Sequence, residues 1–136
     1  MFSSKNQDRI IKLIDFGVSQ IIPTETHLMS TLVGTPLYMA PEILSGSKYA
    51  EDVDWWAIGV ILYVLLCGYP PFEADNESDL RKEIFDSGIK FDSADWSNVS
   101  DEAQDLVRKL LTIDNSKRIK IEDIINHPWM QEECSR

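Results

Sequence analysis

One long apolar segment constrains the fold of this chain more than any other feature. Within residues 49–66, every position from Trp55 to Leu66 except Ala57 and Gly59 carries a large hydrophobic side chain. Glu51 and Asp52 favour a helix N-terminus here because carboxylates complement the helix dipole, and Gly-Tyr-Pro-Pro at 68–71 ends the helix. A helix that is hydrophobic nearly all round is buried inside a core. The longest apolar run, Ala57 to Tyr69, is too short to cross a bilayer, so the segment predicts the central helix of a globular domain.

Helical patterns dominate the rest of the chain as well. A short helix over 40–44 is closed by Gly46, a charged helix over 77–85 is closed by Gly88, and an irregular loop over 91–98 is anchored by Trp96. Ser100 can cap the helix that follows. Apolar stripes mark two late helices: Ala103, Leu106, Val107, Leu110 and Leu111 in one, and Ile121, Ile124, Ile125 and Trp129 in the last.

The first part of the chain lacks these helical patterns. Residues 10–14 form an apolar run that predicts a short strand, and residues 16–35 show no sustained period, as expected of a long loop. The fold class is therefore mainly α, with a short β element at the front. A chain of 136 residues with 43% hydrophobic content is long enough for one domain.

Charge and cysteine usage exclude several classes of function. The net charge of −10 argues against nucleic acid or an anionic membrane as a main partner. Cys67 lies in an apolar run and Cys134 in a polar tail, which favours a buried thiol and a free surface thiol over a disulfide. His127 precedes Pro128, so a packing role at a helix end is favoured over metal binding. The sequence shows no signal peptide, and we expect a cytoplasmic protein.

An ordered series of short motifs carries the functional signal. Asp15-Phe16-Gly17 follows the apolar run, and the glycine lets the backbone turn sharply. This tripeptide alone is weak evidence, because an ordinary strand-to-turn exit can produce it. The later motifs make chance improbable because they follow in a fixed order. They are Gly34-Thr35-Pro36, Met39-Ala40-Pro41-Glu42, Asp54-Trp55-Trp56-Ala57-Ile58-Gly59, Gly68-Tyr69-Pro70-Pro71-Phe72, Arg118 and His127-Pro128-Trp129.

In this order the motifs resemble the C-terminal helical lobe of Ser/Thr protein kinase domains. The resemblance covers most of the chain, from about Ile10 to Trp129. It implies a partial kinase domain over residues 1–136, with the DFG strand and activation loop at 10–42 and a helical core at 43–130. The N-terminal β-lobe of the family, its glycine-rich loop and its HRD catalytic loop have no counterpart in this sequence.

The resemblance implies an active-site role for several residues. Asp15 would bind the Mg²⁺ that bridges the phosphates of ATP, and it is a candidate catalytic residue together with Thr35, which would lie against the acceptor hydroxyl. Phe16 would pack beneath the ATP site and Gly17 would permit its change of position. The remaining implied residues form the pocket for the substrate residue that follows the acceptor: Leu37 and Tyr38.

Other motif residues are expected to be structural. Glu42 and Arg118 resemble the ion pair that joins the APE segment of the family to a late loop, although two independent surface charges remain an alternative. Asp54 and Trp56 belong to the D-x-W-x-x-G helix. Asp54 would bond the catalytic loop, which this sequence does not contain, so desolvation without a partner would favour its protonated form.

Two neighbouring residues are candidate phosphorylation sites in the activation loop. Thr31 lies where many kinases of the family carry an activating phosphothreonine, and Ser30 is the alternative. A phosphate there would pair with the arginine of the family's catalytic loop, which is not in this chain. An unmodified loop threonine is an equally good interpretation.

Three segments resemble the calcium/calmodulin-regulated group, and most of all the calcium-dependent protein kinases: Gly68-Tyr69-Pro70-Pro71-Phe72, Phe91-Asp92-Ser93 with Trp96, and His127-Pro128-Trp129. The implied cofactors are ATP and Mg²⁺, with Ca²⁺ acting indirectly through regions not present here, and the implied partners are protein substrates. We expect the chain alone to lack kinase activity, since positioning groups of the family are absent. One side of the central helix should be covered by a second copy, by a chain carrying the front half, or by rearrangement. The alternative function is a non-catalytic interaction module derived from the kinase fold.

Overall fold

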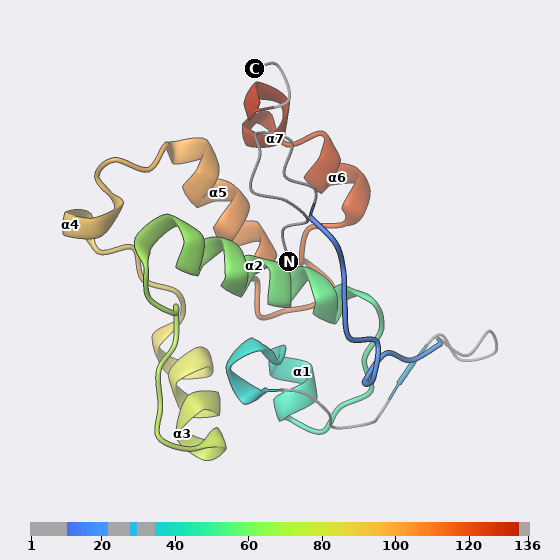
Figure 1. The fold of residues 1–136 in the computed structure, drawn as a ribbon. Coiled ribbons are helices and arrows are strands. Elements are labelled where there is room, and N and C mark those ends of the chain that lie inside the picture. The colour runs from blue at the N-terminus through green and yellow to red at the C-terminus, as the bar shows by residue number, and fades with distance from the viewer. Residues whose placement is uncertain (1–10, 22–27, 30–34, 134–136) are drawn as a thin grey trace.

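The computed structural model describes residues 11–21, 28–29 and 35–133, and this part of the chain is mainly helical, as expected (Figure 1). In chain order the elements are the 3-10 helix η1 (Pro36–Tyr38), α1 (Pro41–Leu44), α2 (Asp52–Cys67), α3 (Glu77–Lys82), the π-helical turn η2 (Glu83–Ser87), α4 (Ser93–Trp96), α5 (Asp101–Leu110), α6 (Ile121–Ile125) and α7 (Pro128–Glu133).

Helix α2 lies at the centre of the fold, and α5 packs against it (Figure 1). Gly59 permits this close approach, because a Cβ atom there would lie 2.8 Å from the Cβ atom of Leu110. Gly68 ends α2 in the left-handed conformation and donates its N–H to the carbonyl of Val64. The larger buried cluster consists of Met39, Ala40, Leu44, Trp56, Val60, Tyr63, Phe72, Leu80, Ile84, Trp96, Val107 and Leu111.

One face of α2 is not covered by any residue that the structure describes. Ile58, Ile61 and Leu65 are exposed, and their spacing places them along one side of the helix. The sequence analysis expects a partner for one side of this helix, and the identity of that partner stays a prediction.

The segment between α3 and α5 contains more helix than the sequence suggests. We expected an irregular loop over 91–98, whereas residues Ser93–Trp96 form α4, with the carboxylate of Asp92 accepting from the N–H of Ala94. Trp96 does anchor the segment: it is buried, and its ring centroid lies 4.7 Å from that of Tyr63 and 4.6 Å from that of Phe91. A short turn of helix forms because the cap and the buried ring fix both of its ends.

Helix α5 follows its predicted pattern. The hydroxyl of Ser100 accepts from the N–H of Ala103, as expected of a capping serine. The predicted stripe is buried, and the members that face the core are Ala103, Leu106, Val107, Leu110 and Leu111.

The last predicted helix is two helices, α6 and α7, because Pro128 cannot continue α6 and instead begins α7. Its apolar stripe is only partly buried, since Ile121 and Ile125 are exposed. His127, between the helices, is buried, and its Nε2 atom lies 3.0 Å from Oδ2 of Asp105 in α5. This contact fits the packing role predicted for the histidine.

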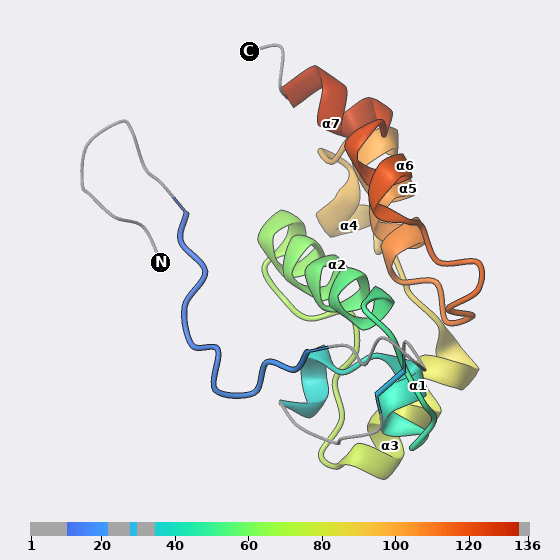
Figure 2. The same ribbon diagram turned by 90° about the vertical axis from the view of Figure 1, so that its right-hand side faces the viewer.

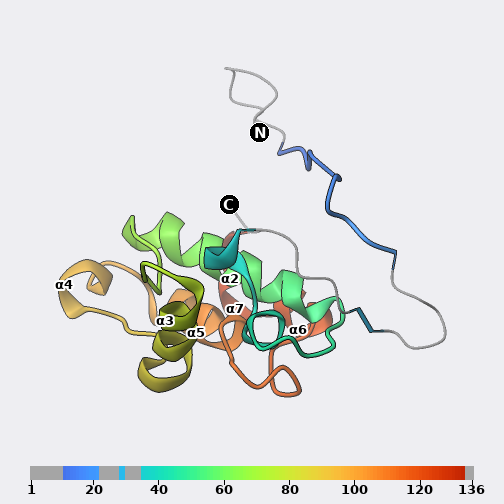
Figure 3. The ribbon, with the colours of Figure 1, turned by 90° about the horizontal axis from the view of Figure 1, so that it is seen from below.

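The strand expected at the front is absent from residues 11–14. These residues extend away from the helices and their large side chains are exposed; Ile11 occupies a single β-bridge position (Figures 2 and 3). A strand needs a neighbour to satisfy its backbone groups, and the described residues supply none here. A second bridge joins Met29 to Tyr49 through two backbone hydrogen bonds. Within the described residues, no helix has both the length and the apolar character needed to cross a membrane.

Candidate functional site

Four of the predicted site residues line one open pocket of about 440 Å³. Asp15 reaches it from the front segment, Thr35 and Tyr38 from the η1 region, and Asp54 from the first turn of α2. Apolar side chains complete much of the wall. They include Val18, Met29, Met39, Ile43, Val53 and Ala57. Residues far apart in the sequence therefore meet at one concave surface.

The turn at Asp15 has an unusual backbone. Asp15 itself is left-handed, with φ of 63°, and its Oδ1 atom accepts from the N–H of Gly17 at 3.2 Å. Aspartate tolerates this region better than most residues because its short carboxylate can bond locally. Sequence reasoning assigned the sharp turn to Gly17, but its role here differs: a Cβ atom on Gly17 would lie 3.1 Å from the Asp15 carboxylate. Glycine thus leaves room for that carboxylate.

Asp54 is the site residue with the clearest electrostatic signature. Its side chain is exposed, yet burial by the surrounding pocket atoms raises the pKa of the carboxyl group. Desolvation is the one cause of this shift, and among the described residues no hydrogen bond to the Asp54 carboxylate opposes it. A raised pKa is expected for an aspartate that is desolvated without a partner, because desolvation favours the neutral form.

Only some residues of the loop before α1 line the pocket. Backbone hydrogen bonds from Tyr38 to Thr35 and from Met39 to Pro36 form the single turn η1, which brings Thr35 and Tyr38 to the pocket wall. Leu37 is half-buried and does not line the pocket.

One further predicted residue, the phenylalanine of the Asp-Phe-Gly motif, lies away from the pocket wall. Phe16 is 68% exposed and does not line the pocket wall, so its role beneath a nucleotide stays a prediction. Thr31 and Ser30, the candidate phosphorylation sites, lie outside the described residues.

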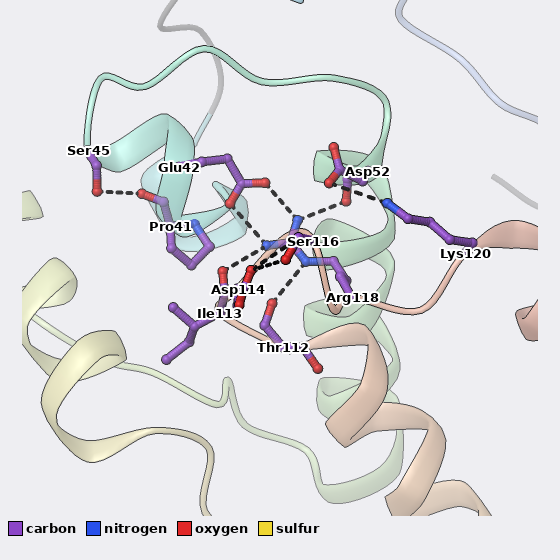
Figure 4. Close-up of polar contacts among 10 residues, drawn as sticks. All are labelled: Pro41, Glu42, Ser45, Asp52, Thr112, Ile113, Asp114, Ser116, Arg118 and Lys120. Atoms are coloured by element: carbon purple, nitrogen blue, oxygen red, sulfur yellow. Dashed lines mark hydrogen bonds and ion pairs between the residues drawn. The ribbon is translucent and has the colours of Figure 1, made fainter.

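A buried ion pair anchors the α1 segment to the helical body (Figure 4). Arg118 donates from its two terminal nitrogens to the two carboxylate oxygens of Glu42, at 2.7 and 3.0 Å. The Arg118 side chain is fully buried, and that of Glu42 is only 9% exposed. The pair expected from the sequence is therefore present, and the two charges are not independent surface groups. Bidentate geometry of this kind is the strong form of a charge-assisted hydrogen bond.

Arg118 also satisfies three backbone carbonyls from two parts of the chain. It donates to the carbonyl oxygens of Asp52 at 3.0 Å, Thr112 at 3.0 Å and Ile113 at 3.5 Å. Its guanidinium carbon lies 5.3 Å from the centroid of Trp56, the buried tryptophan of the D-x-W-x-x-G helix. One side chain thus ties the α1 segment, the start of α2 and the 112–118 loop together (Figure 4).

Sequence reasoning missed the contribution of Asp52. We read it only as a favourable residue for a helix N-terminus, but its side chain is buried, with Oδ2 lying 3.9 Å from Nζ of Lys120. Its Oδ1 atom has no partner among the described residues. Only the three-dimensional position of Lys120 connects these two residues, so no local pattern could have indicated the contact.

The pocket can supply part of a magnesium site. Mg²⁺ is commonly bound through one or two carboxylates together with substrate phosphates. Asp15 offers such a carboxylate at the pocket wall, with one oxygen engaged by Gly17. Within the described residues no group of three or more His, Cys, Asp or Glu side chains could hold a metal alone. Asp15 therefore offers a single carboxylate ligand, and the described residues contain no complete metal site.

Asp15 and Thr35, which line one pocket, are the residues that the kinase resemblance assigns to phosphoryl transfer. The comparison with known families identifies the class of protein. Residues 1–130 match the protein kinase domain, and the chain belongs to the protein kinase family.

Several curated proteins are similar to this chain. The probable serine/threonine-protein kinase fhkE of Dictyostelium discoideum is 46% identical over 128 residues, which cover 91% of this chain and 18% of that protein. Myosin light chain kinase A of the same organism is 41% identical over 131 residues, covering 96% and 44%. Calcium-dependent protein kinase 3 of Plasmodium yoelii yoelii is 38% identical over 131 residues, covering 96% and 24%. The chain thus spans less than half the length of each.

Proposed function

We propose that this chain is the C-terminal lobe of a Ser/Thr protein kinase domain that transfers the γ-phosphate of ATP to Ser or Thr residues of protein substrates. The observation that carries the proposal is the meeting of Asp15 and Thr35 at one pocket, on a loop that the buried Glu42–Arg118 pair anchors. Phosphoryl transfer depends mainly on positioning and electrostatics, and an anchored loop supplies positioning.

Each pocket residue has a distinct proposed role. Asp15 would be a ligand of Mg²⁺, which when bound neutralises negative charge on the phosphates. Thr35 would lie against the acceptor hydroxyl, and Leu37 and Tyr38 would contact the substrate residue that follows it. Phe16 and Gly17 would adjust the floor of the nucleotide site. Phosphorylation of the loop would fall on Thr31 or Ser30.

Regulation and location are further parts of the proposal. Similarity to a calcium-dependent protein kinase supports calcium regulation of the whole protein through regions that this chain does not contain. We place the protein in the cytoplasm, on the sequence evidence given above. The chain alone would be inactive, because Asp15 by itself cannot hold both the nucleotide and the acceptor in line.

A second candidate function is a non-catalytic interaction module. The exposed apolar face of α2, formed by Ile58, Ile61 and Leu65, favours it, since such faces commonly mark contacts with other chains. Under this interpretation Asp15 and Thr35 would have no chemical role.

Peptide phosphorylation by a chimera separates the two functions. The N-terminal part of the kinase domain of myosin light chain kinase A, joined to this chain, should phosphorylate Ser/Thr peptides when given ATP and Mg²⁺. Asp15→Asn should reduce the rate by at least about a hundredfold, because it removes a metal ligand. Asp75→Asn, an exposed aspartate that does not line the pocket, is the matched control and should leave the rate unchanged.

The chain alone should show no phosphorylation above background. A folded chimera without activity, or one that Asp15→Asn leaves fully active, would contradict the kinase proposal and favour the interaction module.

A further inference from the structure

The buried carboxylate of Asp52 has few groups to compensate its charge. Its side chain is only 9% exposed, and its Oδ1 atom has no hydrogen-bond partner among the described residues. Burying an ionised carboxylate is costly unless a cation or hydrogen-bond donors replace the lost water. Asp52 is the first residue of α2, so the helix dipole supplies part of this compensation. A nearby cation must supply the rest.

Arg118 lies close to Asp52 but has no donor left for its side chain. A guanidinium group has five N–H donors. Arg118 uses one of them on the backbone carbonyl of Asp52. The others go to the two carboxylate oxygens of Glu42 and to the carbonyls of Thr112 and Ile113. The bidentate pair with Glu42 also matches the charge of Arg118.

Among the described residues, Lys120 is the one cation that forms an ion pair with the Asp52 side chain. Its Nζ atom lies 3.9 Å from Oδ2 of Asp52 (Figure 4). This distance is too long for a hydrogen bond, so the attraction is Coulombic. Solvent screens it less than a pair of exposed charges, because Asp52 is nearly buried. The Lys120 side chain is 53% exposed and keeps much of its hydration, so the pair does not require the burial of a second ion.

Backbone contacts hold Lys120 opposite the start of α2. The preceding residue, Ile119, is buried, and its N–H donates to the carbonyl of Lys109 at 3.3 Å. The carbonyl of Lys120 accepts from the N–H groups of Asp123 and Ile124 in α6, at 3.0 and 2.9 Å. The ion pair therefore links the first turns of two helices that are far apart in the sequence.

The same turn of α2 forms part of the candidate active-site pocket. Glu51, Val53 and Asp54 line the pocket, whereas Asp52, which lies between them in the sequence, does not. The Asp52 side chain is directed toward Lys120 instead (Figure 4). A movement of Asp52 toward water would also move its neighbours at the pocket wall, because the hydrogen bonds of a helical turn make it move as a unit.

We propose that Lys120 is a positioning residue for phosphoryl transfer: it holds the first turn of α2 through Asp52 and thereby keeps Asp54 at the pocket wall. The positioning role rests on the proposed kinase function, whereas the ion pair does not. An exposed lysine ordinarily contributes little to stability. Lys120 should contribute more, because its partner is buried and has no other counter-charge among the described residues.

Thermal unfolding of the 136-residue chain tests the ion pair. Lys120→Met should lower the unfolding midpoint by at least about 4 °C, because it leaves the Asp52 carboxylate without a counter-charge. The double variant Asp52→Asn with Lys120→Met should lower it by less, since no buried charge is then unpaired. Lys117→Met is the matched control. Its side chain is 77% exposed and pairs with the half-exposed Asp114, so the midpoint should change by less than about 2 °C.

Peptide phosphorylation by the chimera with myosin light chain kinase A tests the positioning role. Well below the unfolding temperature, Lys120→Met should lower kcat about tenfold and change KM for ATP by less than about twofold, because misplaced groups slow the chemical step. Lys120→Arg keeps the charge and should restore kcat. Ile84→Val removes a buried methyl group away from the pocket. It should lower the unfolding midpoint and leave kcat unchanged, which separates positioning from a general loss of stability.

The outcomes distinguish the two proposals. A folded but inactive unaltered chimera would contradict the kinase function, and the positioning role would fail with it. An active chimera in which Lys120→Met keeps full kcat, or in which Ile84→Val loses as much, would overturn the positioning role alone. Equal midpoint shifts for Lys120→Met and the double variant would show that Lys120 does not compensate Asp52, and the inference would fail at its first step.

Discussion

The Arg118 anchor and the Asp15 pocket lie on either side of the first turn of α2, and they are built in opposite ways. At the anchor, Arg118 is fully buried and its donors reach two carboxylate oxygens and three backbone carbonyls. At the pocket, Asp15 is exposed, and Asp54 has a raised pKa caused by desolvation. The Arg118 guanidinium is fully hydrogen-bonded where it holds the fold, whereas the Asp15 and Asp54 carboxylates lie at an open pocket where chemistry is proposed.

The difference is sharpest between two residues of α2. The backbone carbonyl of Asp52 accepts from Arg118, whereas the side chain of Asp54, one half-turn later, lies in the open pocket. A helix that is fixed at Asp52 therefore also fixes the position of Asp54. Rigid supports of this kind reduce the motion of groups that must meet a substrate. Variants on the two sides should consequently differ in both size and sign of their effects on stability.

Removing the guanidinium should produce the largest effect. Arg118→Ala leaves the nearly buried Glu42 carboxylate and several carbonyl oxygens without their donor. Breaking a buried pair from one side costs about 3–5 kcal/mol. Urea unfolding followed by circular dichroism measures the loss. The exposed Lys117→Ala is the control, and because surface pairs contribute little it should change stability by less than about 1 kcal/mol.

The double variant Glu42→Gln with Arg118→Met separates the charge from the packing. It should lose less stability than Arg118→Ala alone, because no buried charge is left unpaired. Equal losses in the two variants would show that packing against Trp56, rather than charge, dominates the anchor.

A smaller effect is expected where α2 meets α5. Gly59→Ala places a Cβ atom within 3 Å of Leu110 and Leu111, so the helices must move apart. Overpacking of this kind costs roughly 1–3 kcal/mol, which exceeds the gain in helix propensity from alanine. Ile58→Ala, on the exposed face of α2, should cost less. A neutral or stabilised Gly59→Ala chain would show that this helix contact is loose.

The comparison of the two regions also explains what the sequence could predict. The central helix, the α5 stripe and the cap at Ser100 follow from periodicity and local hydrogen bonding, and all are present. The Glu42–Arg118 pair could be predicted only through the family resemblance, since the residues lie 76 positions apart.

Other features depend on neighbours that no local pattern encodes. The apolar run at 11–14 has strand character but lacks a partner strand within the described residues, so it stays extended and exposed. The left-handed backbone of Asp15 was missed because glycine, two residues later, seemed the better candidate for the turn. The division of the last helix follows from Pro128, a local signal that the apolar stripe outweighed in our interpretation.

At the pocket, removing a charge should stabilise the chain. The raised pKa of Asp54 means that the folded chain holds this proton more tightly than the unfolded chain, so stability falls as pH rises through that range. Asp54→Asn should therefore be more stable at neutral pH, by less than about 1 kcal/mol because the group is exposed. Below an ordinary aspartate pKa of about 3.9 the advantage should disappear. A destabilised Asp54→Asn chain at neutral pH would indicate a partner for the carboxylate.

The smallest effect is expected for Phe16, which contrasts with a buried phenylalanine of the scaffold. Phe16→Ser should change the free energy of unfolding by no more than about 0.5 kcal/mol, because the ring is exposed. Phe72→Ala should cost about 3–5 kcal/mol, since that ring is 2% exposed and stacks on Trp56 with centroids 5.9 Å apart.

The same Phe16→Ser substitution in the chimera should lower the phosphorylation rate without unfolding the protein. Its proposed role depends on a nucleotide site that the isolated chain does not complete. Similar losses of stability for the two phenylalanines in the isolated chain would mean that the front segment packs as firmly as the anchor, and the contrast between the two regions would fail.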